Sequence, residues 1–202
     1  MPGSDDLTRL RRALDAAAAP SSDFDLNAGA KAALPPTRKL RPAGVLVPLI
    51  DSPEGLRLIL TKRSSKLKHH PGQIAFPGGK VDPTDAGPED AALRETEEEI
   101  GLPRASVSLL GALPVHETVT GFAMAPFVGL VTGPFAPRAE PGEVAEIFSL
   151  PFAHVTEAAR FSVQSRRWRG ERRHYFTVPY GPYYIWGATA RILRGLAERL
   201  SP

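Results

Sequence analysis

Residues 87–103 read Gly-Pro-Glu-Asp-Ala-Ala-Leu-Arg-Glu-Thr-Glu-Glu-Glu-Ile-Gly-Leu-Pro. This stretch predicts one helix over Pro88–Ile100, because glycine and proline are favoured where a helix begins and acidic residues stabilise its first turn. Glu89 and Asp90 supply those acidic residues, and the Gly-Leu-Pro at 101–103 ends the helix. It is the clearest single element in the sequence.

Three carboxylates of this helix, Glu95, Glu98 and Glu99, fall within an arc of about 100°. Like-charged neighbours repel by roughly 0.2–0.5 kcal/mol per pair, and acids in the last turn face the negative end of the helix dipole at about 0.3–1 kcal/mol each. A divalent cation reverses both effects, because oxygen ligands suit Mg²⁺ or Mn²⁺. Helix spacing alone leaves two interpretations open: a metal site, or an acidic face exposed to water.

Arg94 stands directly before these carboxylates. It can reach a neighbouring carboxylate or a loop carbonyl and so fix the orientation of metal ligands, which is the usual role of residues behind a metal site. An ordinary ion pair with Asp90 or Glu98, four residues away on either side, predicts the same contact. The spacing does not separate the two.

The composition is that of a globular protein, with 42% hydrophobic and 23% charged residues over 202 positions. The absence of cysteine excludes disulfides, thiolate nucleophiles and cysteine-held zinc or iron–sulfur sites. The longest apolar run, 44–50, is far shorter than the roughly 20 residues of a membrane helix, and the first residues do not resemble a signal peptide. We therefore expect a cytoplasmic protein with no membrane partner.

The formal net charge of +3 is too small to indicate nucleic-acid binding. The charges are unevenly placed, because cations gather in 62–70 and 166–174 whereas acids gather in 82–99. A basic segment followed by an acidic one suits a phosphorylated small molecule held through a divalent cation. Two solvated surfaces are the alternative.

The chain is predicted to divide near residue 40. Leucines at helical spacing from Leu7 predict a short helix that continues through Ala19, and Pro20 stops it. Residues 21–39 are rich in Ala, Pro and Asp, which indicates an irregular link. Residues 1–40 therefore form an N-terminal helix and irregular extension, and residues 41–202 form the main domain.

The main domain is predicted to be α/β with a mixed sheet, because strand patterns alternate with helix patterns. The expected strands are 45–50, 56–61, 107–114, 124–132, 143–148 and 173–178. The first two form a hairpin around the turn at 51–55. Two further helices are expected at 152–159 and 185–200.

Gly79 together with residues 94–102 resembles the Nudix box, whose second half reads Arg-Glu-apolar-any-Glu-Glu-any-Gly-apolar. The first half departs from the usual pattern in two ways. One extra residue separates the glycine from Arg94, and Ala86, next to Asp85, takes the position usually held by glutamate. The resemblance therefore leaves the early acidic residue unassigned.

This resemblance implies a Nudix α/β/α sandwich with a mixed β-sheet. It also implies a hydrolase that uses Mg²⁺ or Mn²⁺ as its cofactor. The implied metal ligands are Glu95, Glu98, Glu99 and the main-chain carbonyl of Gly79.

Residues 60–80 read Leu-Thr-Lys-Arg-Ser-Ser-Lys-Leu-Lys-His-His-Pro-Gly-Gln-Ile-Ala-Phe-Pro-Gly-Gly-Lys. They resemble the extra motif of the coenzyme A pyrophosphatase branch of Nudix hydrolases, which shares the longer spacing before the arginine. Residues 185–190 are also similar to that branch. The resemblance implies cleavage of coenzyme A to adenosine 3′,5′-bisphosphate and 4′-phosphopantetheine, or to acyl-phosphopantetheine from an acylated substrate.

Hydrolysis of a diphosphate needs a base that takes a proton from the attacking water. Glu98 is our first hypothesis for this base, with Glu143 or Glu146 on a later loop as alternatives, and Arg94 completes the catalytic group. Glycines at 78 and 79 let the backbone approach metal and phosphate. The expected substrate-binding residues are Arg63, Lys66, Lys68, Gly78 and Lys80.

Two rival functions remain at this stage. Another Nudix substrate, such as ADP-ribose or a dinucleotide, would keep the acidic helix and change only the basic segment. A non-catalytic module that binds RNA or a protein predicts missing glutamates, whereas all three are present. We expect a small-molecule substrate, no nucleic-acid partner, and a monomer or homodimer.

Overall fold

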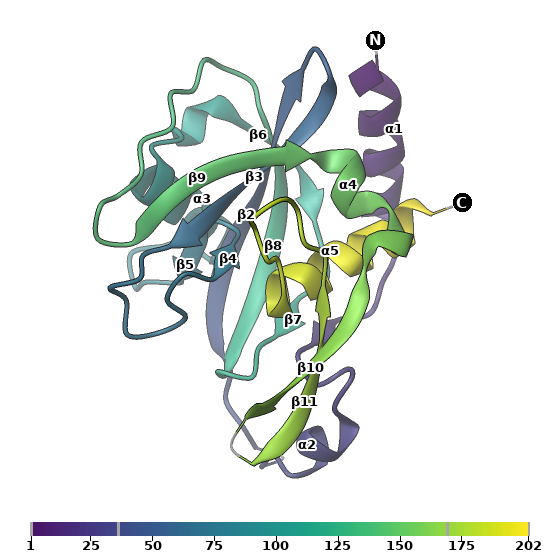
Figure 1. The fold of residues 1–202 in the computed structure, drawn as a ribbon. Coiled ribbons are helices and arrows are strands. Elements are labelled where there is room, and N and C mark those ends of the chain that lie inside the picture. The colour runs from purple at the N-terminus through teal and green to yellow at the C-terminus, as the bar shows by residue number, and fades with distance from the viewer. Residues whose placement is uncertain (1, 36, 169, 202) are drawn as a thin grey trace.

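The computed structural model describes residues 2–35, 37–168 and 170–201. Its helices are α1 (Pro2–Asp15), α2 (Ala28–Ala32), α3 (Pro88–Ile100), α4 (Phe152–Thr156) and α5 (Gly187–Leu200). Its strands are β1 (Ser21–Ser22), β2 (Arg41–Ser52), β3 (Gly55–Arg63), β4 (Ile74–Ala75), β5 (Gly78–Lys80), β6 (Val107–Ala112), β7 (His116–Glu117), β8 (Phe122–Val131), β9 (Val144–Pro151), β10 (Ser162–Trp168) and β11 (Glu171–Thr177). Figure 1 labels them along the ribbon.

In the described residues, nine strands form one sheet, and β10 and β11 form a separate antiparallel hairpin (Figure 1). The sheet order is β1-β7-β8-β2-β3-β4, with β5 also paired to β2, β6 to β8 and β9 to β3. The pairs β2·β8 and β1·β7 are parallel, and the other pairs are antiparallel. The predicted mixed sheet is confirmed.

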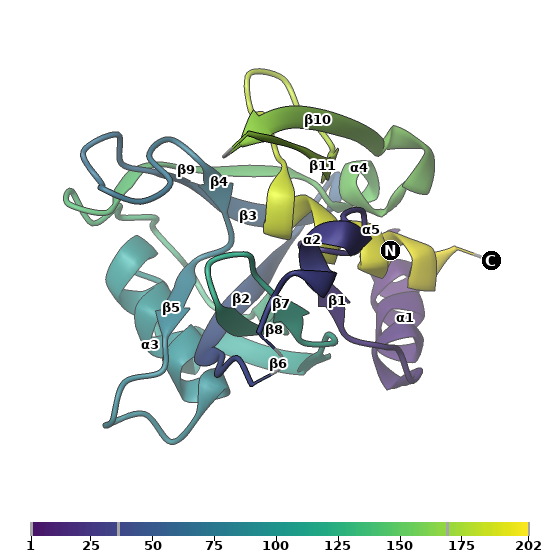
Figure 2. The same cartoon turned by 90° about the horizontal axis from the view of Figure 1, so that it is seen from below.

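Helices cover both faces of this sheet. Seen from below in Figure 2, α3 lies on one side of the central strands, and α4 and α5 lie on the other. Along β2, Val45, Val47 and Leu49 join the core cluster on the α5 side, whereas Leu46 joins the cluster on the α3 side. Because successive side chains of a strand point to opposite faces, the apolar run 44–50 is what a strand covered on both faces requires. The fold is the predicted α/β/α sandwich.

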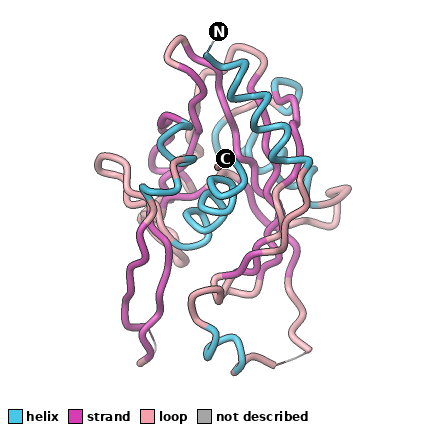
Figure 3. The backbone as a smooth tube through the Cα atoms, turned by 90° about the vertical axis from the view of Figure 1, so that its right-hand side faces the viewer, coloured by secondary structure: helices cyan, strands magenta, loops and turns pink. Residues whose placement is uncertain are grey.

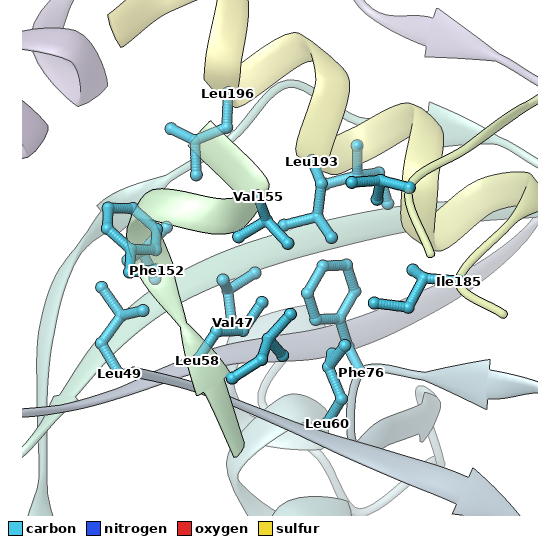
Figure 4. Packing of buried hydrophobic residues seen from close by; sticks show 14 of the residues in the cluster. Val47, Leu49, Leu58, Leu60, Phe76, Phe152, Val155, Ile185, Leu193 and Leu196 are labelled. Atoms are coloured by element: carbon cyan, nitrogen blue, oxygen red, sulfur yellow. The ribbon is translucent and has the colours of Figure 1, made fainter. Parts of the chain in front are cut away.

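The larger core cluster fills the space between the sheet and α5. In Figure 4, Leu58 and Phe76 from the sheet side meet Val155 of α4 and Leu193 of α5. The stripe predicted on the last helix is present, because Ile192, Leu193 and Leu196 are buried and Leu200 is partly buried. This cluster holds α5 against the sheet.

Most predicted elements are found, with some differences at their ends. The helix Pro88–Ile100 has its predicted bounds, and the first two predicted strands form the β2–β3 hairpin. The last helix begins at Gly187, two residues later than expected. Strand β10 was not predicted. Within the described ranges, no helix has the length and apolar character needed to cross a membrane.

The N-terminal region differs from its prediction. Helix α1 ends at Asp15 and does not continue through Ala19, and the expected irregular link contains β1 and α2. Figure 3 shows α1 beside the C-terminal helix. Leu10 of α1 and Phe24 are both buried. The expectation of an irregular link is therefore corrected, whereas the domain division at residue 40 stays a prediction.

A buried histidine holds β1 in place. His116 of β7 is fully buried, and its two ring nitrogens are hydrogen-bonded to Ser21 Oγ at 2.9 Å and Asp23 Oδ1 at 3.1 Å. The second Asp23 oxygen accepts the Val119 N–H at 2.8 Å. These contacts join positions almost one hundred residues apart, which local composition does not encode.

Candidate active site

The start of α3 lies against β2 because Gly44 has no side chain. A Cβ atom at Gly44 would lie 1.7 Å from the carbonyl oxygen of Pro88. At the other end, Gly101 has a φ of 74°, the left-handed conformation that glycine adopts without strain, and its N–H donates to the carbonyl of Glu97 at 2.9 Å. The start of α3 is thereby placed against the sheet, and its end is capped by a glycine.

The loop before β9 contacts the C-terminal end of α3. The N–H of Arg138 donates to the carbonyl of Ile100, and the N–H of Glu140 donates to the carbonyl of Glu99, both at 2.9 Å. Helix-end carbonyls need such partners, because no later turn supplies them. These bonds hold the loop that carries Glu143 beside the carboxylates of the helix.

Glu99 is the most buried of the three carboxylates, with 5% of its surface exposed. The N–H of Gly78 donates to its Oε2 at 3.1 Å. Burial raises the pKa of Glu99 to about 8, opposed by the Gly78 N–H and by Arg63, and the nearby charges of Glu95 and Glu143 raise it further. A carboxylate in this position is stabilised by a positive charge.

Glu95 lies directly over Gly79. A Cβ atom at Gly79 would come within 2.4 Å of the Glu95 carboxylate, so only glycine leaves room for this side chain. Burial raises the pKa of Glu95, while the adjacent Arg94 lowers it and the charges of Glu98 and Glu143 raise it. Gly79, which the motif predicted, thus lets the Glu95 carboxylate lie beside the main chain of residue 79.

Arg94 is bound mainly by Asp85. Its Nε donates to Asp85 Oδ1 at 2.8 Å and its Nη2 to Asp85 Oδ2 at 3.0 Å, which is a bidentate pair. These bonds lower the pKa of Asp85 to about 2, with help from the main-chain N–H of Asp82. Only 2% of the Asp85 side chain is exposed. Asp85 is therefore the partner of Arg94, a role that the sequence motif left unassigned.

The remaining donors of Arg94 reach two glutamates of α3 and the main chain of β5. Nη1 donates to Glu98 Oε2 at 3.0 Å, and Nη2 donates to Glu95 Oε1 at 3.2 Å and to the Lys80 carbonyl at 3.3 Å. Arg94 therefore makes both kinds of contact expected for it, to a neighbouring carboxylate and to a loop carbonyl. It connects the loop at 80–85 with two of the three candidate metal ligands.

The three candidate bases differ in their surroundings. The Glu98 side chain is 58% exposed and free to turn, apart from its bond to Arg94. Glu143 is exposed, and its charge acts on both Glu95 and Glu99. Glu146 instead accepts the hydroxyl of Tyr183 at 2.5 Å.

The basic segment follows β3 and closes onto the same loop. Arg63 ends β3, and its charge lowers the pKa of Glu99. The N–H of Ser64 donates to the carbonyl of Glu143 at 2.7 Å. The side chains of Lys66, Lys68 and Lys80 are exposed. Arg63 is thus brought to the carboxylates. Lys66 and Lys68 lie in the loop after β3 and Lys80 is the last residue of β5, and all three are accessible to a ligand.

The donor set fits a hard divalent cation, because it consists of carboxylate and carbonyl oxygens. In the ranges that the structure describes, no three His, Asp or Glu side chains are gathered closely enough to hold a metal as they stand. Glu98 is turned toward Arg94, whereas Glu95 and Glu99 lie at Gly79 and Gly78. Because the Glu98 side chain is 58% exposed, it has room to turn away from Arg94.

The family is defined by comparison with known proteins. A family model described as the NUDIX domain matches residues 40–170. The chain is 42% identical to "Uncharacterized Nudix hydrolase NudL" of Cronobacter sakazakii over 160 residues, which are 79% of this chain and 83% of that protein. The protein of the same name from Escherichia coli K12 is 41% identical over 160 residues, which again are 79% of this chain and 83% of that protein. This chain belongs to the Nudix hydrolase family.

Two solved structures illustrate the similarity of this chain to known folds. The NUDIX domain of Shewanella oneidensis NrtR, complexed with ADP ribose, has a TM-score of 0.48 at 19% identity and covers 64% of this chain and 85% of its own. A binary complex of the C. elegans Ap4A hydrolase has a TM-score of 0.46 at 17% identity, with 55% and 80% covered.

Proposed function

We propose that this Nudix hydrolase cleaves the diphosphate of coenzyme A or its derivatives with Mg²⁺ or Mn²⁺. The observation that carries the proposal is the placement of Glu95 and Glu99 at Gly78 and Gly79, beside the basic loop that begins at Arg63. The carboxylates that could bind a cation then lie next to the Arg63 guanidinium, which could bind a phosphate. This is the arrangement that a diphosphate substrate needs.

In the proposed site, Glu95, Glu98, Glu99 and the Gly79 carbonyl hold the divalent ions. When bound, the ions neutralise the diphosphate oxygens and favour attack by water. Asp85 and Arg94 act as positioning residues, because their ion pair fixes the Arg94 donor that binds Glu95. Lys80 contributes its carbonyl to Arg94 and leaves its ammonium group free for substrate.

Water attacks one phosphorus, the bond from that phosphorus to the bridging oxygen breaks, and the proton of the water passes to a carboxylate. We assign this carboxylate to Glu98, with Glu143 as the alternative; the bond from Tyr183 makes Glu146 the least suited. Changing Glu98→Gln should lower kcat by about 10²–10⁴-fold, and Glu143→Gln should have a smaller effect. Near-normal turnover of E98Q at saturating Mg²⁺, with E143Q inactive, would transfer the role to Glu143.

The basic loop supplies the proposed specificity. Arg63, Lys66 and Lys68 can form charge-assisted hydrogen bonds with the diphosphate or with the ribose 3′-phosphate of coenzyme A. The double variant K66A/K68A should lose more kcat/KM toward coenzyme A than toward dephospho-coenzyme A, which lacks the 3′-phosphate. Equal losses on the two substrates would refute a 3′-phosphate contact.

A substrate panel tests the proposed function as a whole. Coenzyme A, its disulfide, an acylated form, ADP-ribose and a dinucleotide are each incubated with the protein and Mg²⁺, and the products are identified by mass spectrometry. We expect the highest kcat/KM for one of the coenzyme A species, with adenosine 3′,5′-bisphosphate as a product. Preference for ADP-ribose or the dinucleotide would establish the rival substrate class, and no metal-dependent product would establish a binding module.

Three broader expectations stay proposals. We propose that residues 41–202 carry the catalytic domain and that the protein acts in the cytoplasm on a small molecule. We also propose that it is a monomer or a homodimer. Light scattering coupled to size-exclusion chromatography tests the last point, and a mass above that of two chains would contradict it.

A further inference from the structure

The β10–β11 hairpin stands outside the main sheet, and the outer edge of β10 is unpaired in the described residues. Strand β11 is held on its outer side by Asn27, whose side chain bonds the main-chain carbonyl and N–H of His174 at 2.8 and 2.9 Å. Thr177 of β11 also forms a bridge with Trp186. Strand β10 is seven residues long, and residues 162–167 are exposed. It therefore presents a row of main-chain N–H and C=O groups to solvent, on a hairpin that extends away from the sandwich (Figure 3).

This hairpin carries positive charges directly opposite one another. The register pairs Arg166 with Arg173 and Arg167 with Arg172. Arg166 lies over the ring of Trp186, with its guanidinium carbon 4.3 Å from the ring centre. Arg167 and Arg172 are exposed, and neither forms an ion pair with a carboxylate of the residues that the structure describes. Like charges opposite each other on an antiparallel pair are destabilising, so an anion beside this edge would stabilise the hairpin.

The unpaired edge and the positive charge together select the kind of partner. The edge offers hydrogen bonds to another extended polypeptide main chain, which a nucleic acid does not have. A second copy of this chain is disfavoured, because two β10 strands side by side would bring Arg166 and Arg167 of both copies together. An acidic peptide satisfies both the edge and the charge.

We propose that β10 binds an acidic peptide segment of another protein, which adds to the hairpin as a third strand. The main chain of the segment pairs with the outer edge of β10. Arg166 and Arg167 are neighbours in the strand and so point to opposite faces of the hairpin. Two adjacent acidic residues of the peptide then meet one arginine on each face. The interaction is independent of the proposed diphosphate hydrolysis, because none of these residues belongs to the proposed diphosphate site.

Fluorescence anisotropy of labelled peptides titrated with the full chain tests this proposal. The probe is the end-blocked peptide Thr-Val-Glu-Glu-Val-Thr. One control peptide replaces both glutamates by glutamine, and a second keeps the glutamates but carries N-methyl groups along its main chain. We expect saturable binding of the probe that weakens as the NaCl concentration rises, and binding at least about tenfold weaker for both controls. The N-methylated peptide keeps its charge and loses its main-chain donors, so it separates strand addition from attraction between charges.

Arg167→Glu tests the role of the charge in the protein. This change places a negative charge opposite Arg172, so R167E should not melt below the wild type. It should weaken binding of the acidic probe by roughly tenfold, because an attraction becomes a repulsion. The matched control is Arg11→Glu in α1, an exposed arginine on another element, which should bind like the wild type. Hydrogen exchange followed by mass spectrometry should show slower exchange of the β10 amides when the probe is bound.

The proposal fails on any one of four results. The first is no saturable binding of the acidic probe in the millimolar range. The second is equal binding of the N-methylated peptide, which would exclude strand addition. The third is unchanged binding of the probe by folded R167E, which would place the peptide elsewhere. The fourth is tighter binding of a single-stranded oligouridylate than of the acidic probe at the same NaCl concentration, which would indicate a nucleic-acid partner instead.

Discussion

At the scale of single residues, the Arg94–Asp85 ion pair fixes the directions in which Arg94 donates to the carboxylates of α3. A guanidinium bound through two parallel hydrogen bonds has a fixed plane, so its other donors have fixed directions. Those donors reach Glu95 and Glu98. The sequence motif identified the arginine but not its anchor, because the acidic residue stands one position away from the usual one.

Asp85→Asn should lower kcat/KM by about 10–100-fold, as is typical when a residue that orients metal ligands is lost. The amide removes the charge and one acceptor of the bidentate pair with Arg94, the pair that lowers the pKa of Asp85 to about 2 and so favours its charged form. Steady-state kinetics with increasing Mg²⁺ measures the effect.

The matched control is Asp82→Asn in the same loop. Its carboxylate is exposed and lies 3.7 Å from Arg94 Nη2, outside hydrogen-bond distance. It should keep near-normal activity. Equal losses in D82N and D85N would show that general loop charge, and not the bidentate pair, is what matters.

The raised pKa of Glu99 predicts a pH-dependent stability in metal-free protein. The folded pKa of about 8 exceeds the ordinary value of 4.5, so the folded state holds the proton more tightly than the unfolded chain does. The favourable contribution is complete below 4.5 and is lost as the pH rises to about 8. In EDTA, Glu99→Gln should therefore melt above the wild type at pH 8, with a smaller difference at pH 5.

Thermal unfolding followed by circular dichroism at the two pH values measures this. Glu97→Gln is the control, because Glu97 lies on the same helix and is exposed. The same difference in melting temperature between E99Q and the wild type at pH 8 and at pH 5 would contradict the burial of a charged carboxylate at this position.

At the scale of elements, the site depends on how closely α3 approaches β2 and β5. Glycines permit this approach, at Gly44 against Pro88 and at Gly79 against Glu95. The main chain of β5 then lies next to the carboxylates without a side chain between them. Strand and helix together form the site, and neither holds it alone.

Gly79→Ala should lower kcat on the order of 100-fold, because displacing an active-site group by about 1 Å has effects of that size. The added methyl group would occupy the position of the Glu95 carboxylate. Gly87→Ala is the matched control, since its φ of 160° is extended backbone and nothing lies within 4 Å of the added carbon. Equal activity of the two variants would show that the Glu95 position is not critical.

Elements with strong local signals were the predictable ones. Helix α3 has proline at its start and glycine at its end, and β2 has an unbroken apolar run. Strand β10 has neither, because Ser162–Arg167 is exposed and polar for most of its length and pairs only with β11. Strands β1 and β7 have two residues each, and their pairing depends on His116 meeting Ser21 across 95 positions.

The candidate site was predictable to the same degree. The three glutamates and Gly79 follow from the motif, and the structure places Glu95 and Glu99 together at the glycines. Asp85 and the capping of α3 by residues 138–140 depend on loops whose paths are set by tertiary contacts. No periodic pattern in the sequence encodes those paths.

At the scale of the whole molecule, the N-terminal region is packed onto the sandwich. Phe24 is 2% exposed, and Arg199 of the last helix binds main-chain carbonyls at the end of α1. The side chain of Asn27 forms two hydrogen bonds with the main chain of His174 in β11. Both ends of the chain therefore contribute to one folded unit.

Phe24→Ala should lower the free energy of unfolding by about 3–5 kcal/mol, the usual cost of removing a buried aromatic side chain. Denaturant unfolding of the full chain measures it. Lys31→Ala, an exposed change in the same region, should be within about 0.5 kcal/mol of the wild type. An F24A stability equal to that of K31A would mean that residues 21–32 do not pack as described.

The central claim is that the carboxylates of α3 hold divalent ions beside Gly78 and Gly79 of β5. An anomalous difference map from a crystal of the protein soaked in Mn²⁺ tests it most directly. We predict a Mn²⁺ peak coordinated by Glu95, Glu98 and Glu99 together with the Gly79 carbonyl. A map with Mn²⁺ at other positions and none beside these carboxylates would contradict the account.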